Sequence, residues 1–186
     1  MYVWAVQIGV GGLIYYGRTW SQFQHFINQI SDIYELHLTR HLVIYVHNLS
    51  YEFQFMRNYF DWVNIFAVSE RKPIKAITNT GIEFRDSYIL SGFSLANTAK
   101  NLVKHKIKKM DGVLDYSLIR HERTPLTEVE LEYLRMDVVI ITSYIDEQLD
   151  IYKDISKIPA TNTGRVRKFV RDNCYYTSKS HKKTSR

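Results

Sequence analysis

A capped amphipathic segment begins at Thr127. Thr127 and Glu130 form the Thr-x-x-Glu pattern of a capping box, in which each side chain bonds the other residue's backbone N–H and starts a helix. Apolar residues then recur at three- or four-residue intervals, at Leu131, Leu134, Val138, Ile141 and Ile145. This spacing predicts one long helix whose apolar face packs against the rest of the molecule.

Short apolar segments in the first half of the chain predict a sheet. Residues 2–10 and 13–16 flank a Gly-Gly pair, which is typical of a β-hairpin. Residues 42–46 form an uninterrupted apolar run of the kind found in a buried central strand. Further strands are expected at 65–68, 74–78 and 82–84, the last two joined by the turn Asn79-Thr80-Gly81.

Helical spacing between and after these strands completes the fold class. It predicts helices at 21–33, with Ser21 as the N-terminal cap, at 51–60 and at 94–103. Strands with helices between and after them predict an α/β domain, with a mixed sheet flanked by helices. We expect this domain to span residues 1–158, followed at 159–186 by a basic segment that leads out of it.

The positive charge is concentrated near the C-terminal end. The net charge is +6, yet eight Lys or Arg and a single Asp lie between Arg165 and Arg186, so the preceding body is near neutral. Overall basicity is therefore weak support for a DNA-binding groove, and a solvated polar tail is the alternative interpretation.

Composition excludes several classes of protein. A hydrophobic content of 45% with 14% aromatic residues is typical of a globular chain. The single cysteine, Cys174, excludes an internal disulfide framework and a Cys-based zinc site. The sequence offers no apolar run of about 18 residues to span a membrane and no basic region of a signal peptide. We therefore expect a cytoplasmic protein without a membrane partner.

Two groups of polar residues, here called the two constellations, lie where a ligand or a metal ion could bind. The segment from His47 to Phe53 follows the apolar run 42–46, and ligands bind beyond the carboxyl ends of such strands in open α/β sheets. Tyr133 and Asp137 are spaced i, i+4, which places a phenol and a carboxylate on one face of the predicted long helix. Such a carboxylate can hold a divalent metal, and the phenol can position water.

Each constellation also has a purely structural interpretation. In the first, Asn48 forms a turn, Ser50 caps a helix and Glu52 favours the first helical turn. In the second, Tyr133 is half-buried and Asp137 is solvated on an amphipathic helix. Spacing alone favours these structural interpretations.

Taken together, these segments resemble the 3′ to 5′ exonuclease domain of protein-primed family B DNA polymerases, found in phages and linear plasmids. His47-Asn48-Leu49-Ser50-Tyr51-Glu52 is similar to the second exonuclease motif, and Tyr133-x-x-x-Asp137 to the third. Three shorter matches lie between them in the expected order: Asp86-Ser87-Tyr88, Ser94-Leu95-x-x-x-Ala99 and Gly112-x-x-Asp115-Tyr116. The resemblance implies an RNase H-like fold and two-metal phosphodiester hydrolysis with Mg²⁺ or Mn²⁺.

The resemblance also implies roles for individual residues. Asp137 and Glu52 would bind metal, with Glu52 at a position where the family often has Asp, and Tyr133 would orient the attacking water. The residues that would bind the 3′ end of single-stranded DNA are His47, Asn48, Tyr51, Ser87 and Tyr88. Lys108 or Lys109 would place a cation near the scissile phosphate.

Parts of the family pattern are absent from this sequence. The family's first strand carries Asp-x-Glu, whereas no acidic residue precedes Asp32, so the first strand and half of the metal ligands are expected to be missing. No polymerase domain follows, although in the family that domain and a terminal protein are partners. We therefore expect a phage- or plasmid-encoded DNA polymerase fragment, in the bacterial host cytoplasm, without autonomous nuclease activity. Two alternatives stay open: a non-catalytic module that binds single-stranded DNA, and one half of a split exonuclease completed by an upstream polypeptide.

Overall fold

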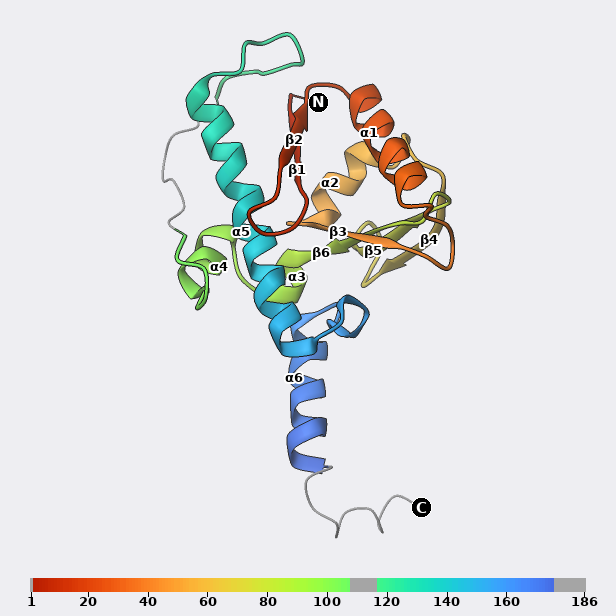
Figure 1. The fold of residues 1–186 in the computed structure, drawn as a ribbon, viewed down its shortest axis with the longest axis vertical. Coiled ribbons are helices and arrows are strands. Elements are labelled where there is room, and N and C mark those ends of the chain that lie inside the picture. Colours follow the sequence, from red (N-terminus) through yellow and green to blue (C-terminus); the bar gives the residue numbers. More distant parts are fainter. Residues whose placement is uncertain (1, 108–116, 176–186) are drawn as a thin grey trace.

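Two separate β-sheets and one long helix organise the computed structural model, which describes residues 2–107 and 117–175 (Figure 1). Strands β1 (Trp4–Gln7) and β2 (Ile14–Gly17) form an antiparallel pair, which confirms the predicted hairpin. The second sheet has four strands in the order β3-β6-β5-β4. Their bounds are Leu42–Val46 for β3, Trp62–Ala67 for β4, Pro73–Thr78 for β5 and Ile82–Asp86 for β6.

The four-stranded sheet is mixed, because β3 runs parallel to β6 while β5 pairs antiparallel with both β6 and β4. This arrangement confirms the predicted α/β class. The expectation of a central strand at 42–46 is wrong for the described residues, since β3 pairs with β6 alone and lies at an edge of its sheet. An apolar run indicates that other elements cover both faces of a strand. It does not indicate that the strand pairs with a neighbour along both of its edges.

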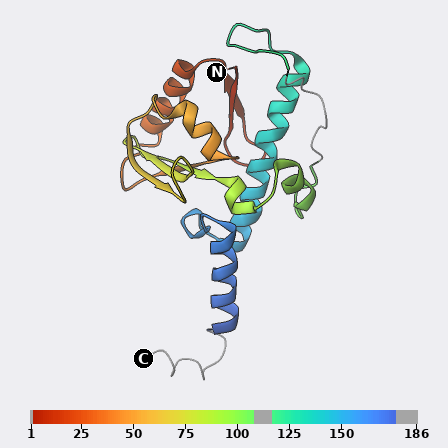
Figure 2. The same ribbon diagram turned by 180° about the vertical axis from the view of Figure 1, so that it is seen from behind.

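Helices cover both faces of this sheet (Figures 1 and 2). On one face, α1 (Trp20–Ile33) and α2 (Leu49–Met56) share a core cluster with β5 and β6. On the other, α5 (Glu128–Tyr152) packs Tyr144 and Ile145 against Leu90 of α3 (Ser87–Ser91). The short helix α4 (Leu95–Asn101), capped by Ser94, packs on α5 through the fully buried Ile140. The long helix predicted from the capping box at Thr127 is thus confirmed.

The start of α1 differs from the prediction. Thr19 caps this helix instead of Ser21: its hydroxyl accepts from the Gln22 N–H at 3.1 Å, and the Gln22 side chain accepts from the Thr19 N–H at 3.2 Å. Two backbone donors are satisfied by this reciprocal arrangement, whereas a lone serine satisfies one. The helix therefore begins at Trp20.

A cluster of charged side chains surrounds the buried Glu83 of β6. Glu83 of β6 is 4% exposed and accepts from Arg85 Nε at 2.6 Å, with His41 Nδ1 at 3.1 Å from its other oxygen. Burial alone would raise the pKa of Glu83, but the Arg85 hydrogen bond and charge hold that pKa below its usual value. Arg85 also donates to the Ile155 carbonyl at 2.8 Å, which fastens the 3₁₀ turn η1 (Ile155–Lys157) to the sheet.

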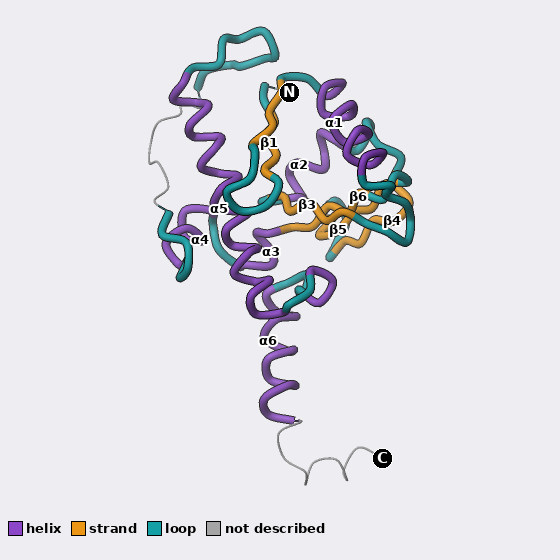
Figure 3. The backbone as a smooth tube through the Cα atoms, in the orientation of Figure 1, coloured by secondary structure: helices purple, strands orange, loops and turns teal. Residues whose placement is uncertain are grey.

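Helix α6 (Asn162–Val170) extends away from the sheets, as the ribbon and the backbone tube both show (Figures 1 and 3). From the sequence we expected only that the helical spacing of apolar residues would be interrupted near these residues. Thr161 starts the helix by accepting from the Gly164 N–H at 2.9 Å. Of the helices in the described part of the chain, none combines the length and apolar character needed to cross a bilayer.

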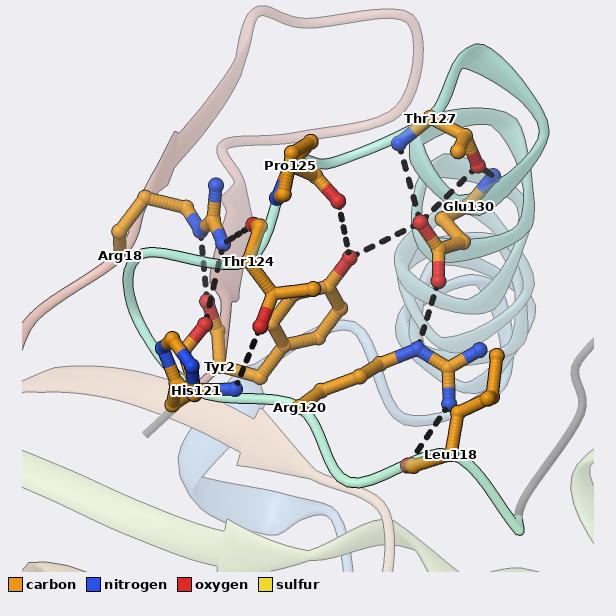
Figure 4. A network of polar contacts seen from close by, with 9 residues as sticks. All are labelled: Tyr2, Arg18, Leu118, Arg120, His121, Thr124, Pro125, Thr127 and Glu130. Carbon is orange, nitrogen blue, oxygen red and sulfur yellow. Dashed lines mark hydrogen bonds and ion pairs between the residues drawn. The ribbon is translucent and has the colours of Figure 1, made fainter.

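A polar network joins Tyr2, just before β1, to the start of α5 (Figure 4). Glu130 Oε2 accepts from the Tyr2 hydroxyl at 2.8 Å and from the Thr127 N–H at 3.0 Å, while its Oε1 accepts from Arg120 Nε at 2.7 Å. Arg18 completes the network, because its Nε donates to the Tyr2 carbonyl at 2.7 Å. The Thr127 and Tyr2 hydrogen bonds, together with Arg120, lower the pKa of Glu130 to about 2.

Replacing Glu130 with Gln should reduce stability at neutral pH and change its pH dependence. A carboxyl whose folded pKa is about 2 instead of 4.5 adds stability that is present above pH 4.5 and is lost as the pH falls towards 2. Urea midpoints at pH 7 and at low pH measure this effect, with the wild type losing more stability than Glu130→Gln on acidification. Glu132→Gln is the control, because Glu132 pairs only at the surface with Arg135. Equal acid sensitivity in all three proteins would contradict the role given to Glu130.

Candidate nucleic-acid interface

A groove of about 1070 Å³ lies between the two sheets, and both β1 and β3 line it. The apolar stripe of α5 contributes Leu134, Val138 and Ile141 to its lining, with Asp137 between them in sequence. Phe23 of α1 and Met56 of α2 line it as well. The groove is therefore mainly apolar along the strands, and its polar lining comes mainly from residues 47–52 and from α5.

The turn after β3 supplies most of these polar groups. His47, Asn48, Tyr51 and Glu52 all line the groove, as the first sequence constellation suggested. Asn48 precedes α2 with a left-handed φ of 66°, a conformation that Asn tolerates better than most residues, and its exposed side chain makes no cap hydrogen bond. The alternative role of Ser50 as the helix cap is wrong, because its hydroxyl donates to the Pro73 carbonyl at 3.4 Å.

Two aromatic rings stand together on α2. Tyr51 and Phe55 are 59% and 51% exposed, both line the groove, and their rings meet edge to face at a centroid distance of 5.1 Å. The sequence analysis missed Phe55, although its position four residues after Tyr51 placed it on the same helical face. Exposed neighbouring aromatic rings are suited to stacking on unpaired bases.

The second predicted DNA-binding pair, Ser87 and Tyr88, lies at the adjoining end of β6. Ser87 is almost fully buried; its Oγ donates to the Val46 carbonyl at 3.3 Å and lies 3.1 Å from His47 Nδ1. Tyr88 is 45% exposed and meets the His47 ring edge to face at 5.4 Å. Ser87 is therefore placed to orient His47, whereas His47 and Tyr88 can reach a ligand. Their roles in DNA binding stay predictions, and Lys108 and Lys109 lie outside the described residues.

The two predicted metal-binding carboxylates, Glu52 and Asp137, both line the groove although they belong to different elements. Glu52 keeps more than a third of its surface accessible to water, yet the protein atoms around it in the groove raise the pKa of its carboxyl by desolvation. Tyr133 lies one turn before Asp137 on α5, is partly buried and is not among the residues that line the groove. The structure thus brings Asp137, but not Tyr133, to the groove surface.

A two-metal centre does not fit the carboxylates described. In residues 2–107 and 117–175, no group of three or more His, Cys, Asp or Glu side chains gathers where one metal ion could bind. Oxygen ligands such as those of Glu52 and Asp137 suit Mg²⁺, which also keeps several waters, but the full ligand set implied by the resemblance is not there. No hydrolytic step is therefore derived for these residues alone.

Replacing Glu52 with Gln should stabilise the protein at neutral pH. Desolvation penalises the charged form of the Glu52 carboxyl and raises its folded pKa above 4.5. The folded protein therefore loses stability as the pH rises from 4.5 through the folded pKa of Glu52. The neutral amide avoids this cost, so urea midpoints of Glu52→Gln should exceed those of the wild type at pH 7 and converge with them below pH 4.5. Glu70→Gln, at a carboxyl with a 91% exposed side chain, should match the wild type at both pH values. A Glu52→Gln protein that is less stable at pH 7 would refute the desolvated placement of Glu52.

Comparisons with known proteins support the fold. No protein-family model matches the sequence, and no curated protein matches it significantly. Among solved structures, Phi29 DNA polymerase complexed with single-stranded DNA matches at a TM-score of 0.64 and 19% identity. Phi29 DNA polymerase complexed with primer-template DNA and incoming nucleotide substrates matches at a TM-score of 0.68 and 18% identity. Each match covers 86% of this chain and 29% of the polymerase, so the chain spans less than a third of that protein and shares the fold of part of it.

Proposed function

We propose that this chain is part of the 3′ to 5′ exonuclease domain of a protein-primed family B DNA polymerase and binds the 3′ end of single-stranded DNA. The observation that carries the proposal is the meeting of two sequence motifs at one groove: Asn48, Tyr51 and Glu52 come from the first, and Asp137 from the second. The polymerase-related fold supports the same assignment. In this proposal the fold is RNase H-like.

DNA recognition would use stacking and hydrogen bonding at the end of the groove. The exposed rings of Tyr51 and Phe55 offer a surface on which the terminal bases stack. The Asn48 side chain, left out of the helix cap, would donate to or accept from the terminal nucleotide. His47 and Tyr88 extend this surface towards the end of β6.

In the complete family domain, metal ions activate the attacking water and stabilise the leaving 3′ oxygen. If another polypeptide segment supplied the remaining carboxylates, Glu52 and Asp137 would contribute two of the ligands of Mg²⁺ or Mn²⁺, and Tyr133, one helical turn from Asp137 but outside the groove lining described, would orient the water. A polymerase domain and a terminal protein would be partners of the longer polypeptide, encoded by a phage or plasmid. Residues 159–186 would then lead from the exonuclease region towards that polymerase domain.

A second candidate function, a non-catalytic module for single-stranded DNA, is favoured by the ligand count. Three described residues that line the groove carry carboxylates; Asp146 is paired with Lys104 and His105, so Glu52 and Asp137 are the two suited to the proposed metal. Mg²⁺ binds tightly only with near-ideal oxygen geometry. We therefore expect these 186 residues to bind DNA without cleaving it, and a split exonuclease would need carboxylates from another polypeptide.

Loss of the Tyr51 ring should weaken binding of single-stranded DNA. Stacking contributes about 1–3 kcal/mol per base, so Tyr51→Ala should weaken binding about fivefold to a hundredfold. Fluorescence anisotropy with a labelled oligothymidine at low salt measures this, and Tyr51→Phe should retain most of the affinity. Tyr34→Ala is the control, because Tyr34 is 46% exposed at the end of α1 and does not line the groove. Equal affinity in the wild type, Tyr51→Ala and Tyr34→Ala would rule out the groove as the DNA site.

Incubation of the purified chain with 5′-labelled single-stranded DNA and Mg²⁺ or Mn²⁺ separates the two candidate functions. We expect no metal-dependent shortening from the 3′ end, since the described carboxylates do not make up a two-metal centre. Shortening that disappears in Asp137→Ala would establish an active nuclease and overturn the non-catalytic expectation.

A further inference from the structure

Asp86 is a buried carboxylate to which the proposed function gives no role. It is the last residue of β6, is 1% exposed and is not among the residues that line the groove, so a ligand in the groove does not touch it. A buried carboxylate is costly unless hydrogen-bond donors or cations surround it. The groups around Asp86 therefore indicate what it does.

One oxygen of Asp86 caps the short helix α3. Its Oδ1 accepts from the Tyr88 N–H at 2.7 Å and from the Ile89 N–H at 3.0 Å. These amides belong to the first turn of the helix, where the helix itself offers no acceptor. The cap therefore fixes the direction in which α3 leaves β6, and with it the position of the half-exposed Tyr88 ring.

The turn after β3 approaches the same carboxylate from the neighbouring strand. Val46 is the parallel partner of Asp86 in the sheet, so the turn that begins at His47 starts beside it. Asn48 has a left-handed backbone, with φ 66° and ψ 55°, and the helix α2 begins at Leu49. A left-handed residue next to a right-handed one turns successive N–H groups to the same side, which makes a concave site for an anion.

The amides of this turn act on the Asp86 carboxyl. Burial raises the pKa of Asp86, whereas four surrounding backbone N–H groups counteract that rise, those of Ile89, Tyr88, Leu49 and Asn48. Asp86 Oδ2 is shielded from water and makes no hydrogen bond within the part of the chain that the structure describes. The amides of Asn48 and Leu49 therefore act on the carboxylate through their dipoles, and one side chain faces the starts of two helices.

We propose that Asp86 is a positioning residue for the DNA-binding surface: its carboxylate holds the starts of α2 and α3 together and so fixes Asn48 relative to Tyr88. The anion stabilises the left-handed backbone of Asn48, which accounts for a helix that starts without a side-chain cap. This holding role rests on the surroundings of Asp86 alone. Its effect on DNA affinity rests on the proposed function, in which residues after β3 and after β6 bind the same single strand.

Amide hydrogen exchange tests the holding role without DNA. Asp86→Asn keeps the size of the side chain and one oxygen that can accept from α3, but it removes the negative charge. A nearby negative charge slows base-catalysed exchange, so exchange at Asn48 and Leu49 should accelerate about fivefold or more in Asp86→Asn. Thr78→Val is the control, because Thr78 is equally buried but accepts from the Ile82 N–H at the other end of β6. It should leave both exchange rates unchanged.

Affinity for a labelled oligothymidine at low salt, measured by fluorescence anisotropy, tests the consequence for DNA. Urea unfolding first verifies that each variant is folded under the binding conditions. Asp86→Asn should then weaken binding about fivefold or more, the lower end of the loss expected for one stacked base. Thr78→Val should bind as the wild type does, even where it is as strongly destabilised. A role of Asp86 in stability alone would leave the affinity of both folded variants unchanged.

Unchanged exchange at Asn48 and Leu49 in Asp86→Asn would overturn the proposal. So would an unchanged DNA affinity of Asp86→Asn in an assay where Tyr51→Ala weakens binding. If the wild type bound no DNA, the proposed function would fail, and the exchange rates would still decide the holding role. Should Asp86→Asn fail to fold, the wild type decides instead: slow exchange of the Asn48 and Leu49 amides would support the proposal, and exchange as fast as in an unfolded chain would contradict it.

Discussion

One long helix packs against a strand of each sheet and thereby holds the two sheets together. Helix α5 contacts β1 on one side of the groove and β3 on the other. A two-stranded sheet such as β1–β2 is marginal by itself, since it has too little apolar surface to bury. The apolar stripe of α5 supplies that surface, and the Tyr2–Glu130–Arg120 network fixes the start of the helix to the residue that lies just before β1.

The same helix explains why residues far apart in the sequence meet. Asp137 lies between Leu134 and Val138 in the apolar stripe of α5. Because the stripe lines the groove, Asp137 lines it as well. The turn after β3 approaches from the other side with Asn48 and Glu52. Desolvation of Glu52 in this groove raises its carboxyl pKa, the condition in which a nearby cation or a hydrogen-bond donor is most favourable.

Local sequence patterns predicted the elements well and their pairing poorly. The capping box at Thr127 and the Gly-Gly turn after β1 act between residues a few positions apart, so the long helix and the hairpin followed from them. The cap expected at Ser21 is wrong because Thr19 and Gln22 cap the helix reciprocally, and the alternative cap at Ser50 is wrong because α2 begins at Leu49 and the Ser50 hydroxyl donates to the Pro73 carbonyl. The edge position of β3 depends on which strands are available to pair, and the open sides of β1 and β3 are properties of the whole arrangement.

In the proposed function, the part of the groove with Asn48 and Tyr51, rather than the basic C-terminal region, binds single-stranded DNA. Amide chemical shifts of the labelled chain, followed while a short oligothymidine is added, test this most directly. We expect the largest shifts at His47, Asn48, Tyr51 and Asp137, with little change in α6. Shifts confined to Arg165, Arg167 and their neighbours in α6 would contradict it.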